Sequence, residues 1–112
     1  MEKLAWINLL YDFYGQLLTQ RQQKFVELYY AHDLSLGEIA EQFGVSRQAV
    51  HDVLKRAEQI LTHYEEKLGL VTRFIDQRRR LGEVLALLDE NSSTLNGETL
   101  SRVREILRDV MG

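Results

Sequence analysis

Hydrophobic side chains recur at intervals of three and four positions along most of the chain, which is the spacing of one face of an α-helix. The spacing predicts a first helix over residues 3–14, ending before Gly15, with an apolar face of Leu4, Ile7, Leu10, Tyr11 and Tyr14. It also predicts a much longer helix that ends at Gly69, with an apolar row of Val50, Leu54, Ala57, Leu61, Tyr64 and Leu68. Proline is absent and helix-breaking stretches are few, so the chain is predicted to be all-α.

Polar residues just before the apolar rows predict where helices begin. Thr19 with Gln22, and Ser35 with Glu38, have the spacing of capping boxes, in which two side chains bond the first unpaired amides of a helix. The first box predicts a helix that carries its apolar row as far as Asp33. The second box predicts a shorter helix directly before the long one.

The segment SLGEIAEQFGVSRQAVHDVLKR, residues 35–56, has the spacing of a helix-turn-helix. Such a motif needs a small residue where the first helix crosses the second, a residue that tolerates positive φ in the turn, and an aliphatic residue facing back from the second helix. Ala40, Gly44 and Val50 meet these needs in turn, and Ser46 is placed to cap the second helix. The segment therefore predicts two helices joined by a tight turn at Gly44.

Beyond Gly69 the pattern predicts two further helices, over residues 70–89 and about 98–111, with residues 91–97 as the loop between them. The last helix has a seam with heptad-type spacing, which requires a partner helix: Leu100, Val103, Leu107 and Val110. We therefore expect a helix-turn-helix domain with its long recognition helix in residues 1–69, and a C-terminal helical hairpin in residues 70–112. The hairpin is expected either to pack on the first part or to serve dimerisation.

The apolar placement leaves a polar, partly basic face on the helix that follows the turn. Arg and Lys reach guanine edges or phosphates, and Gln pairs with adenine. In helix-turn-helix proteins the start of the second helix enters the major groove, and its first amides can hold a phosphate. The residues predicted to bind nucleic acid are Ser46, Arg47, Gln48, His51, Asp52, Lys55 and Arg56. The alternative interpretation is the solvated face of an ordinary amphipathic helix.

Asp52 is the discordant residue on this face. Its carboxylate would repel a phosphate, or pair within the helix with Lys55 or Arg56. It could also accept a hydrogen bond from a cytosine amine.

The charge balance restricts how the chain could bind nucleic acid. The net charge is −3, with seven Lys and Arg against ten Asp and Glu in residues 1–69, and seven of each in residues 70–112. Binding to phosphates must therefore come from a local patch rather than from overall charge. A second basic patch is predicted at Arg73, Arg78, Arg79 and Arg80, although consecutive arginines point in different directions and a solvated face is the default.

Other chemistry finds little support in the sequence. The absence of cysteine excludes disulfides, a thiolate nucleophile and a cysteine zinc site. His32, His51 and His63 are too widely separated to predict a metal site, and Glu65, Glu66, Asp89 and Glu90 are interpreted as exposed helix faces. Aromatic residues at 11, 13, 14, 25, 29 and 30 could stack on bases, but helical spacing assigns most of them to the core. No enzyme activity and no cofactor are expected.

The lack of a long apolar run and of an export signal predicts a cytoplasmic protein without membrane insertion. At 112 residues, with 45% hydrophobic and 28% charged residues, the chain has the composition of a globular domain.

Two resemblances add to this interpretation. The stretch SLGEIAEQFGVSRQAVHDVLKRAEQIL resembles region four of the bacterial sigma factors, which reads the promoter's upstream element. More specifically, residues 7–80 are similar to the YlxM family of small bacterial helix-turn-helix proteins, through DFY, LLT, ELYY, VSRQAV and RFIDQRR. The resemblance implies a sigma region-four-like helix-turn-helix, in which Ser46, Arg47, Gln48, His51 and Lys55 face the nucleic acid. Sigma recognition helices carry more basic residues, whereas here Ala49 and Asp52 stand in this face.

The resemblance to the YlxM family implies a cytoplasmic, non-enzymatic protein linked to the signal recognition particle. One hypothesis is a DNA-binding regulatory protein of that targeting pathway, acting as a homodimer that reads two half-sites. The other is an accessory protein that binds the particle's RNA, or its GTPase protein, and has no specific DNA target.

Overall fold

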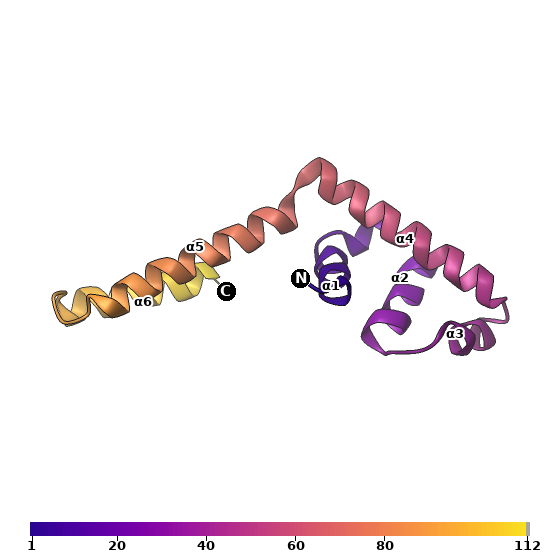
Figure 1. The fold of residues 1–112 in the computed structure, drawn as a ribbon, viewed down its shortest axis with the longest axis horizontal. Helices are drawn as coiled ribbons and strands as arrows, with labels where there is room; N and C mark the ends of the chain where they lie inside the picture. The colour runs from indigo at the N-terminus through magenta and orange to yellow at the C-terminus, as the bar shows by residue number, and fades with distance from the viewer. Residues whose placement is uncertain (112) are drawn as a thin grey trace. The chain divides into compact units, whose positions relative to one another are not determined.

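The computed structural model describes residues 1–111, and over that range the chain forms six α-helices and no β-strand (Figure 1). The all-α prediction is therefore confirmed. The helices are α1 (Lys3–Tyr14), α2 (Gln20–Val26), α3 (Leu36–Phe43), α4 (Arg47–Leu68), α5 (Leu70–Glu90) and α6 (Gly97–Met111). A 3₁₀ turn, η1 (Gly15–Leu17), follows α1, and a π-helical turn, η2 (Glu27–Ala31), follows α2. The chain divides into two compact units, residues 1–71 and residues 72–112.

Both predicted capping boxes are present at the starts of α2 and α3. The Thr19 hydroxyl accepts from the Gln22 amide at 3.1 Å, and the Gln22 side chain accepts from the Thr19 amide at 2.9 Å. Ser35 and Glu38 repeat this exchange at 3.1 and 3.0 Å. The hydrogen bond from the Ser35 amide lowers the pKa of the Glu38 carboxyl, because it stabilises the charged form.

The turn between α3 and α4 has the predicted geometry. Gly44 takes the left-handed conformation, with φ of 65° and ψ of 36°. The Val45 amide donates to the Ala40 carbonyl at 3.0 Å, which closes the end of α3. Ser46 then begins α4, because its hydroxyl accepts from the Ala49 amide at 3.0 Å. In Figure 1, α3 is seen nearly end-on while α4 runs across the view, so the two helices cross steeply.

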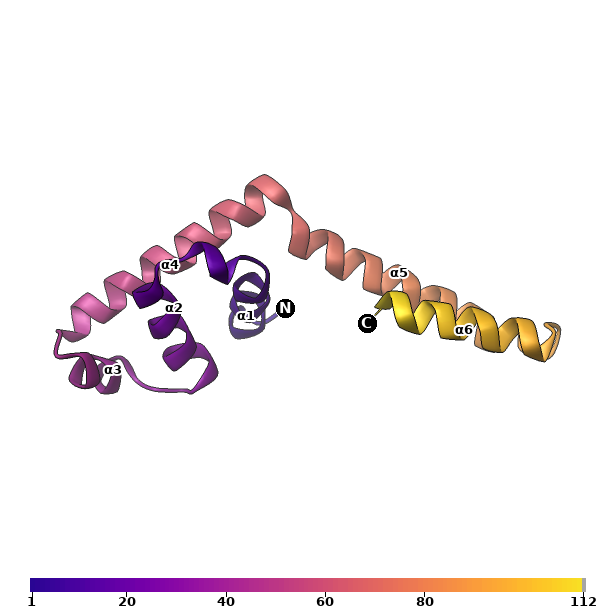
Figure 2. The same cartoon turned by 180° about the vertical axis from the view of Figure 1, so that it is seen from behind.

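The core of residues 1–71 is built around α4, which contacts α1, α2 and α3. Ala40 and Val50 are both buried, as the helix-turn-helix prediction requires. Figure 2 shows the same arrangement from behind, with α1, α2 and α3 all on one side of α4. The largest fully buried side chains are Tyr14, Phe25, Leu10, Ile39, Leu61, Val26, Val50 and Val71. This core holds the start of α4 in place and leaves its polar face outside.

The apolar rows of α1 and α4 differ from the prediction near their ends. Leu4 and Leu68 are half exposed, at 49% and 45%. In α4 the buried row passes instead from Leu61 to Glu65, so the prediction that Glu65 lies on an exposed face is wrong. The prediction placed Tyr64 and Leu68 in this row instead of Glu65 because it considered only apolar residues.

Glu65 is buried in a polar cluster at the junction of α4 and α5. Its Oε1 accepts a hydrogen bond from the Tyr14 hydroxyl at 2.7 Å and another from the Val71 amide at 3.0 Å. The Leu70 amide donates to the Tyr14 hydroxyl at 3.1 Å. Gly69, with φ of 63°, ends α4 in the left-handed conformation. One side chain from α1 and one from α4 therefore satisfy the first amides of α5, which have no partner within the helix.

Two turns interrupt the regular helices of the first unit. Helix α1 ends at Tyr14, directly before Gly15 as predicted, and Gly15, with φ of −58°, begins η1. A Cβ at Gly15 would stand 2.9 Å from the Tyr11 ring, so close approach is what requires glycine here. The second predicted helix, in turn, widens into η2 after Val26 and ends before Asp33, whose φ is 58°.

Residues 72–111 contain most of α5 and all of α6, and the two helices lie side by side in both views, as the hairpin prediction requires (Figures 1 and 2). Arg104 forms an ion pair with Asp89 near the loop, and the Arg78 guanidinium donates to the Met111 carbonyl at 2.6 Å at the other end. The Asn96 side chain accepts from the Glu98 amide at 2.8 Å and begins α6. None of the helices within residues 1–111 has the length and apolar composition that crossing a membrane requires.

Candidate nucleic-acid interface

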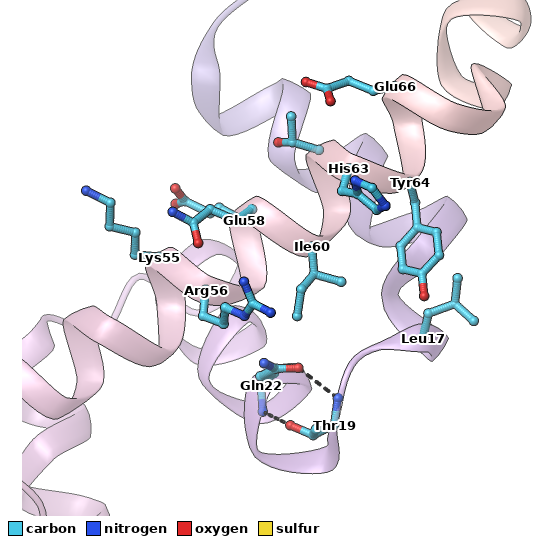
Figure 3. A pocket seen from close by; sticks show the side chains of 12 residues that line it. Leu17, Thr19, Gln22, Lys55, Arg56, Glu58, Ile60, His63, Tyr64 and Glu66 are labelled. Carbon is cyan, nitrogen blue, oxygen red and sulfur yellow. Dashed lines mark hydrogen bonds between the residues drawn. The ribbon is translucent and has the colours of Figure 1, made fainter.

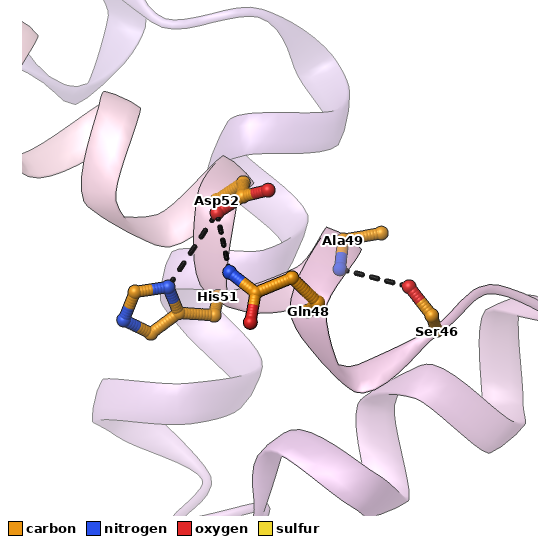
Figure 4. A network of polar contacts seen from close by, with 5 residues as sticks. All are labelled: Ser46, Gln48, Ala49, His51 and Asp52. Atoms are coloured by element: carbon orange, nitrogen blue, oxygen red, sulfur yellow. Dashed lines mark hydrogen bonds and ion pairs between the residues drawn. The ribbon is translucent and has the colours of Figure 1, made fainter.

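The start of α4 presents the residues that the sequence predicted to bind nucleic acid. The Ser46 side chain is exposed at the cap of the helix. The other six predicted side chains are exposed as well: Arg47, Gln48, His51, Asp52, Lys55 and Arg56. They are exposed because Val50 and Leu54, on the opposite side of the helix, are buried in the core. The tight turn at Gly44 leaves the first turn of α4 open to solvent, with the Ser46 cap at its tip (Figure 4). This surface, residues 46–56, is called the α4 face below.

Three side chains of the α4 face already contact one another (Figure 4). The Gln48 amide donates to Asp52 Oδ1 at 2.9 Å, and His51 Nδ1 lies 3.6 Å from the same oxygen. The predicted pairing of Asp52 with Lys55 or Arg56 is thus replaced by contacts with Gln48 and His51. A carboxylate that accepts a hydrogen bond from the Gln48 amide and lies beside the His51 imidazole repels a phosphate less than an unpartnered carboxylate.

Arg47 and Lys55 are placed on two sides of this network. The Arg47 side chain passes over the start of α3, where its Cδ would lie 3.8 Å from a Cβ at Gly37. Lys55 stands two turns further along α4. The cations therefore flank the Gln48–Asp52 pair rather than forming one dense patch, which suits contacts to separate phosphates.

A groove next to Lys55 and His51 was not predicted from the sequence. It has a volume of about 330 Å³ and is lined by residues of α1, η2, α3 and α4, among them Lys3, Tyr29, Tyr30, His51 and Lys55. The rings of Tyr29 and Tyr30 meet edge to face, 5.0 Å apart, and both side chains are half buried. The sequence assigned these tyrosines to the core together with Tyr14 and Phe25, since helical spacing cannot show that η2 turns them towards α4.

A second, larger groove of about 1000 Å³ runs along α4 on the other side of Lys55 (Figure 3). Arg56 and His63 line it from α4, and Leu17 and Thr19 line it from the chain before α2. Its wall on α4 also carries Glu58 and Glu66, so its charge is mixed.

Three arginines of the second basic patch make contacts within α5 and α6. Arg79 and Arg80 share Asp76, at 2.7 and 3.0 Å. Arg78 stacks over the Phe74 ring and bonds the Met111 carbonyl. The arginines at 78–80 therefore hold local contacts, which weakens their prediction as a phosphate-binding surface.

Comparisons with known proteins agree with the helix-turn-helix geometry. Residues 1–101 match the model of a family described as "Putative helix-turn-helix protein, YlxM / p13 like", which extends well beyond the resemblance seen at residues 7–80. The chain is 58% identical to a UPF0122 protein of Desulforamulus reducens over 111 residues, which cover 99% of this chain and 95% of that protein. It is 51% identical over 90 residues to UPF0122 proteins of Bacillus cereus and Bacillus anthracis, covering 80% of this chain and 82% of each relative.

Proposed function

The chain belongs to the UPF0122 family of YlxM / p13-like helix-turn-helix proteins, and on that premise we propose that it binds nucleic acid through the α4 face. The observation that carries the proposal is the start of α4 itself. The left-handed turn at Gly44 and the Ser46 cap leave a helix end exposed, and the polar residues follow directly behind it. A helix with this exposure fits the major groove of duplex DNA.

Each side chain of the α4 face has a role in this proposal. Ser46 and the first amides of α4 hold one phosphate, and Lys55 holds another further along the groove. Arg47 and Gln48 are nearest the helix tip and contact base edges, guanine for Arg47 and adenine for Gln48. His51 and Asp52 lie between them, where Asp52 positions the Gln48 amide.

We propose further that the protein is a cytoplasmic, non-enzymatic regulatory protein that takes part in the signal recognition particle pathway. The support is the likeness of residues 7–80 to the YlxM family, which is linked to that pathway, and the match of residues 1–101 to the family model. Double-stranded DNA is the first candidate partner, because the α4 face has the form of a recognition helix.

The groove lined by Tyr29 and Tyr30 favours a second candidate, the RNA of the signal recognition particle. Unpaired bases stack on aromatic side chains, and His51 and Lys55 line this groove with groups that can bond a backbone. Glu58 also lines the groove, where it pairs with Lys3 and accepts from the Tyr30 hydroxyl. His51 and Lys55 belong to both the groove and the α4 face, so one RNA could contact both. The GTPase protein of the particle is the other partner that the resemblance implies.

A binding experiment separates these candidates. Duplexes selected from a random DNA library, unselected duplexes and the particle's RNA are titrated with the full chain by fluorescence anisotropy at several salt concentrations. We expect a selected duplex to bind about a thousandfold more tightly than random DNA. Arg47→Ala is expected to weaken that complex by about 1–3 kcal/mol and to relax selection at one base. Arg102→Ala removes the same charge from α6 and is expected to leave the Kd unchanged.

Three outcomes would argue otherwise. Tight binding to the RNA with equal, weak binding to all duplexes would replace the DNA hypothesis by the accessory role. Equal effects of Arg47→Ala and Arg102→Ala would show that only overall charge matters. No binding to any nucleic acid would refute the proposal for the α4 face.

A further inference from the structure

One half-buried leucine of α3 stands beside the polar residues of the α4 face. Leu36, together with Arg47, Gln48 and His51, lines an open depression of about 420 Å³. Leu36 is the first residue of α3, whereas the three polar residues come from the first turns of α4. The Leu36 side chain is half buried, so part of its apolar surface stays in contact with solvent. The α4 face is therefore continued by an apolar surface that α4 itself does not supply.

The fold fixes the position of Leu36. The capping box that begins α3 sets the conformation of its first turn. Leu36 lies one turn before the buried Ala40 on the same side of α3, and α3 packs against α4. Gly37, the next residue, has no side chain, and the Arg47 side chain lies over it, with its Cδ and Nε 3.8 Å from the place of a Cβ. Arg47 therefore reaches across the start of α3, next to Leu36.

The chemistry of the major groove limits what an apolar side chain can contact there. Base edges present hydrogen-bond donors and acceptors in this groove, and their apolar feature is the C5 methyl group of thymine. A polar atom placed against Leu36 would lose water without gaining a hydrogen bond, which is costly. A methyl group placed there is removed from water together with part of the leucine surface, which is favourable. Leu36 therefore suits a thymine better than any other base.

The polar neighbours of Leu36 favour a thymine at the same place. Gln48 pairs with an adenine in the proposed complex, and the thymine of an A·T pair presents its methyl group in the same groove. Because Gln48 and Leu36 line one depression, a methyl group in contact with Leu36 belongs to that base pair or to a neighbouring one. An RNA duplex offers no such contact, because uracil lacks the methyl group and the A-form major groove is too narrow for side chains to read.

We propose that Leu36 is a specificity-determining residue, which contacts the C5 methyl group of a thymine in the DNA bound by the α4 face. Since the contact requires that the α4 face enters the major groove of duplex DNA, it rests on the proposed function. The side chains of α4 select hydrogen-bonding base edges, and Leu36 adds selection for one apolar group. Leu36 lies outside the residues that the sequence predicted, because it belongs to α3 and its spacing is typical of a core residue.

Removal of a single methyl group tests this contact without altering the protein. Each thymine of the duplex selected from the random library is replaced in turn by deoxyuridine, which keeps the base pair and lacks only the C5 methyl group. The Kd of the full chain for each duplex is measured by fluorescence anisotropy. We expect the replacement at one position of the bound site to raise the Kd roughly fourfold, because a methyl group that Leu36 had covered returns to water.

Leucine variants then identify the residue that contacts the methyl group. In Leu36→Ala, and in Leu36→Gln with its amide of similar size, the same replacement is expected to leave the Kd unchanged, since the apolar partner is gone. Leu34→Ala is the control, because Leu34 is also half buried but does not line the depression. In Leu34→Ala the replacement should still raise the Kd roughly fourfold. Thymine and deoxyuridine are compared within each variant, so an overall loss of affinity does not affect the comparison.

Three results would overturn the proposal, and they differ in what else they refute. A selected duplex in which no thymine responds to deoxyuridine would refute the methyl contact and leave DNA binding by the α4 face intact. A response that persists in both Leu36→Ala and Leu36→Gln would assign the methyl group to another residue. Failure to select any duplex would refute both DNA binding by the α4 face and the contact by Leu36.

Discussion

At position 65 a carboxyl group occupies the place where the core side of α4 would ordinarily carry a hydrophobic residue. Burial of a carboxyl is costly unless its oxygens accept hydrogen bonds, and here Tyr14 and Val71 donate to it. Burial, followed by the bond to Glu65, raises the pKa of Tyr14, since the charged phenolate is disfavoured in this environment. One residue thus connects α1, the end of α4 and the first turn of α5.

Tyr14→Phe is expected to destabilise the protein by about 1–3 kcal/mol, because Glu65 loses a donor in a buried site and the Leu70 amide loses its acceptor. Urea unfolding followed by circular dichroism measures the loss. Tyr11→Phe is the control, since Tyr11 donates to Glu27 in a partly exposed site and should cost less than 1 kcal/mol. An equal loss from both variants would contradict the special role of Tyr14.

The raised pKa values of the two tyrosines also predict the response to alkali. Burial and the bond to Glu27 raise the pKa of Tyr11 from its ordinary value of 10.0 to about 12. The folded state therefore favours the neutral phenol, so this part of the stability is present below pH 10 and is lost as the pH rises through the folded pKa.

At the scale of elements, the turn between α3 and α4 depends on a single backbone conformation. Gly44 has a positive φ, and a Cβ there would meet nothing within 4 Å. Gly82, in the middle of α5, would likewise have room for a Cβ, but its backbone is helical. The two glycines therefore differ in backbone conformation and not in available space.

The same substitution should consequently have opposite effects at the two positions. Gly44→Ala is expected to lower stability by about 1–2 kcal/mol, because an L-residue is strained in the left-handed region. Gly82→Ala is expected to raise the stability of α5 by up to about 1 kcal/mol, because alanine favours the helix. Thermal melting followed by helix content measures both, and an unchanged melting temperature for Gly44→Ala would contradict the turn.

The elements that the sequence predicted correctly are those set by local spacing. Thr19, Ser35, Ser46 and Gly44 act on residues within a few positions, so their patterns suffice. The burial of Glu65 depends on Tyr14, which is 51 positions away in the sequence, so no local pattern records it. The spacing also did not show that the second helix widens into the π-helical turn η2. For the site, helical periodicity placed the α4 face correctly on the exposed side. Periodicity shows only which side of a helix a residue lies on, so binding of nucleic acid had to be inferred from the chemistry of the side chains.

At the scale of the whole molecule, the two compact units differ in how they are stabilised. Residues 1–71 contain a complete core, which includes Val71 in the first turn of α5. Within the hairpin of residues 72–111, Leu100 alone is buried. The boundary between the two compact units lies after Val71, two residues beyond the glycine that ends α4.

Truncation at this boundary is expected to leave a folded protein. A fragment of residues 1–71 should unfold cooperatively and, on the proposed function, bind nucleic acid through the α4 face. A fragment of residues 1–68 should be less stable by about 2 kcal/mol or more, because it lacks the buried Val71 and the two amides that bond Tyr14 and Glu65. Denaturant unfolding compares the two fragments, and equal stability would show that the start of α5 contributes nothing to the core.

In the proposed complex, the hydrogen bond between Gln48 and Asp52 would hold in place the side chain that reads a base. The terminal amide of Gln48 has two N–H groups, so it can keep the carboxylate as one acceptor and donate its second hydrogen to a base. Because that bond restrains the side chain before binding, less conformational entropy is lost when the base is contacted. Discrimination would then depend on the acid that holds the amide as much as on the amide that reads.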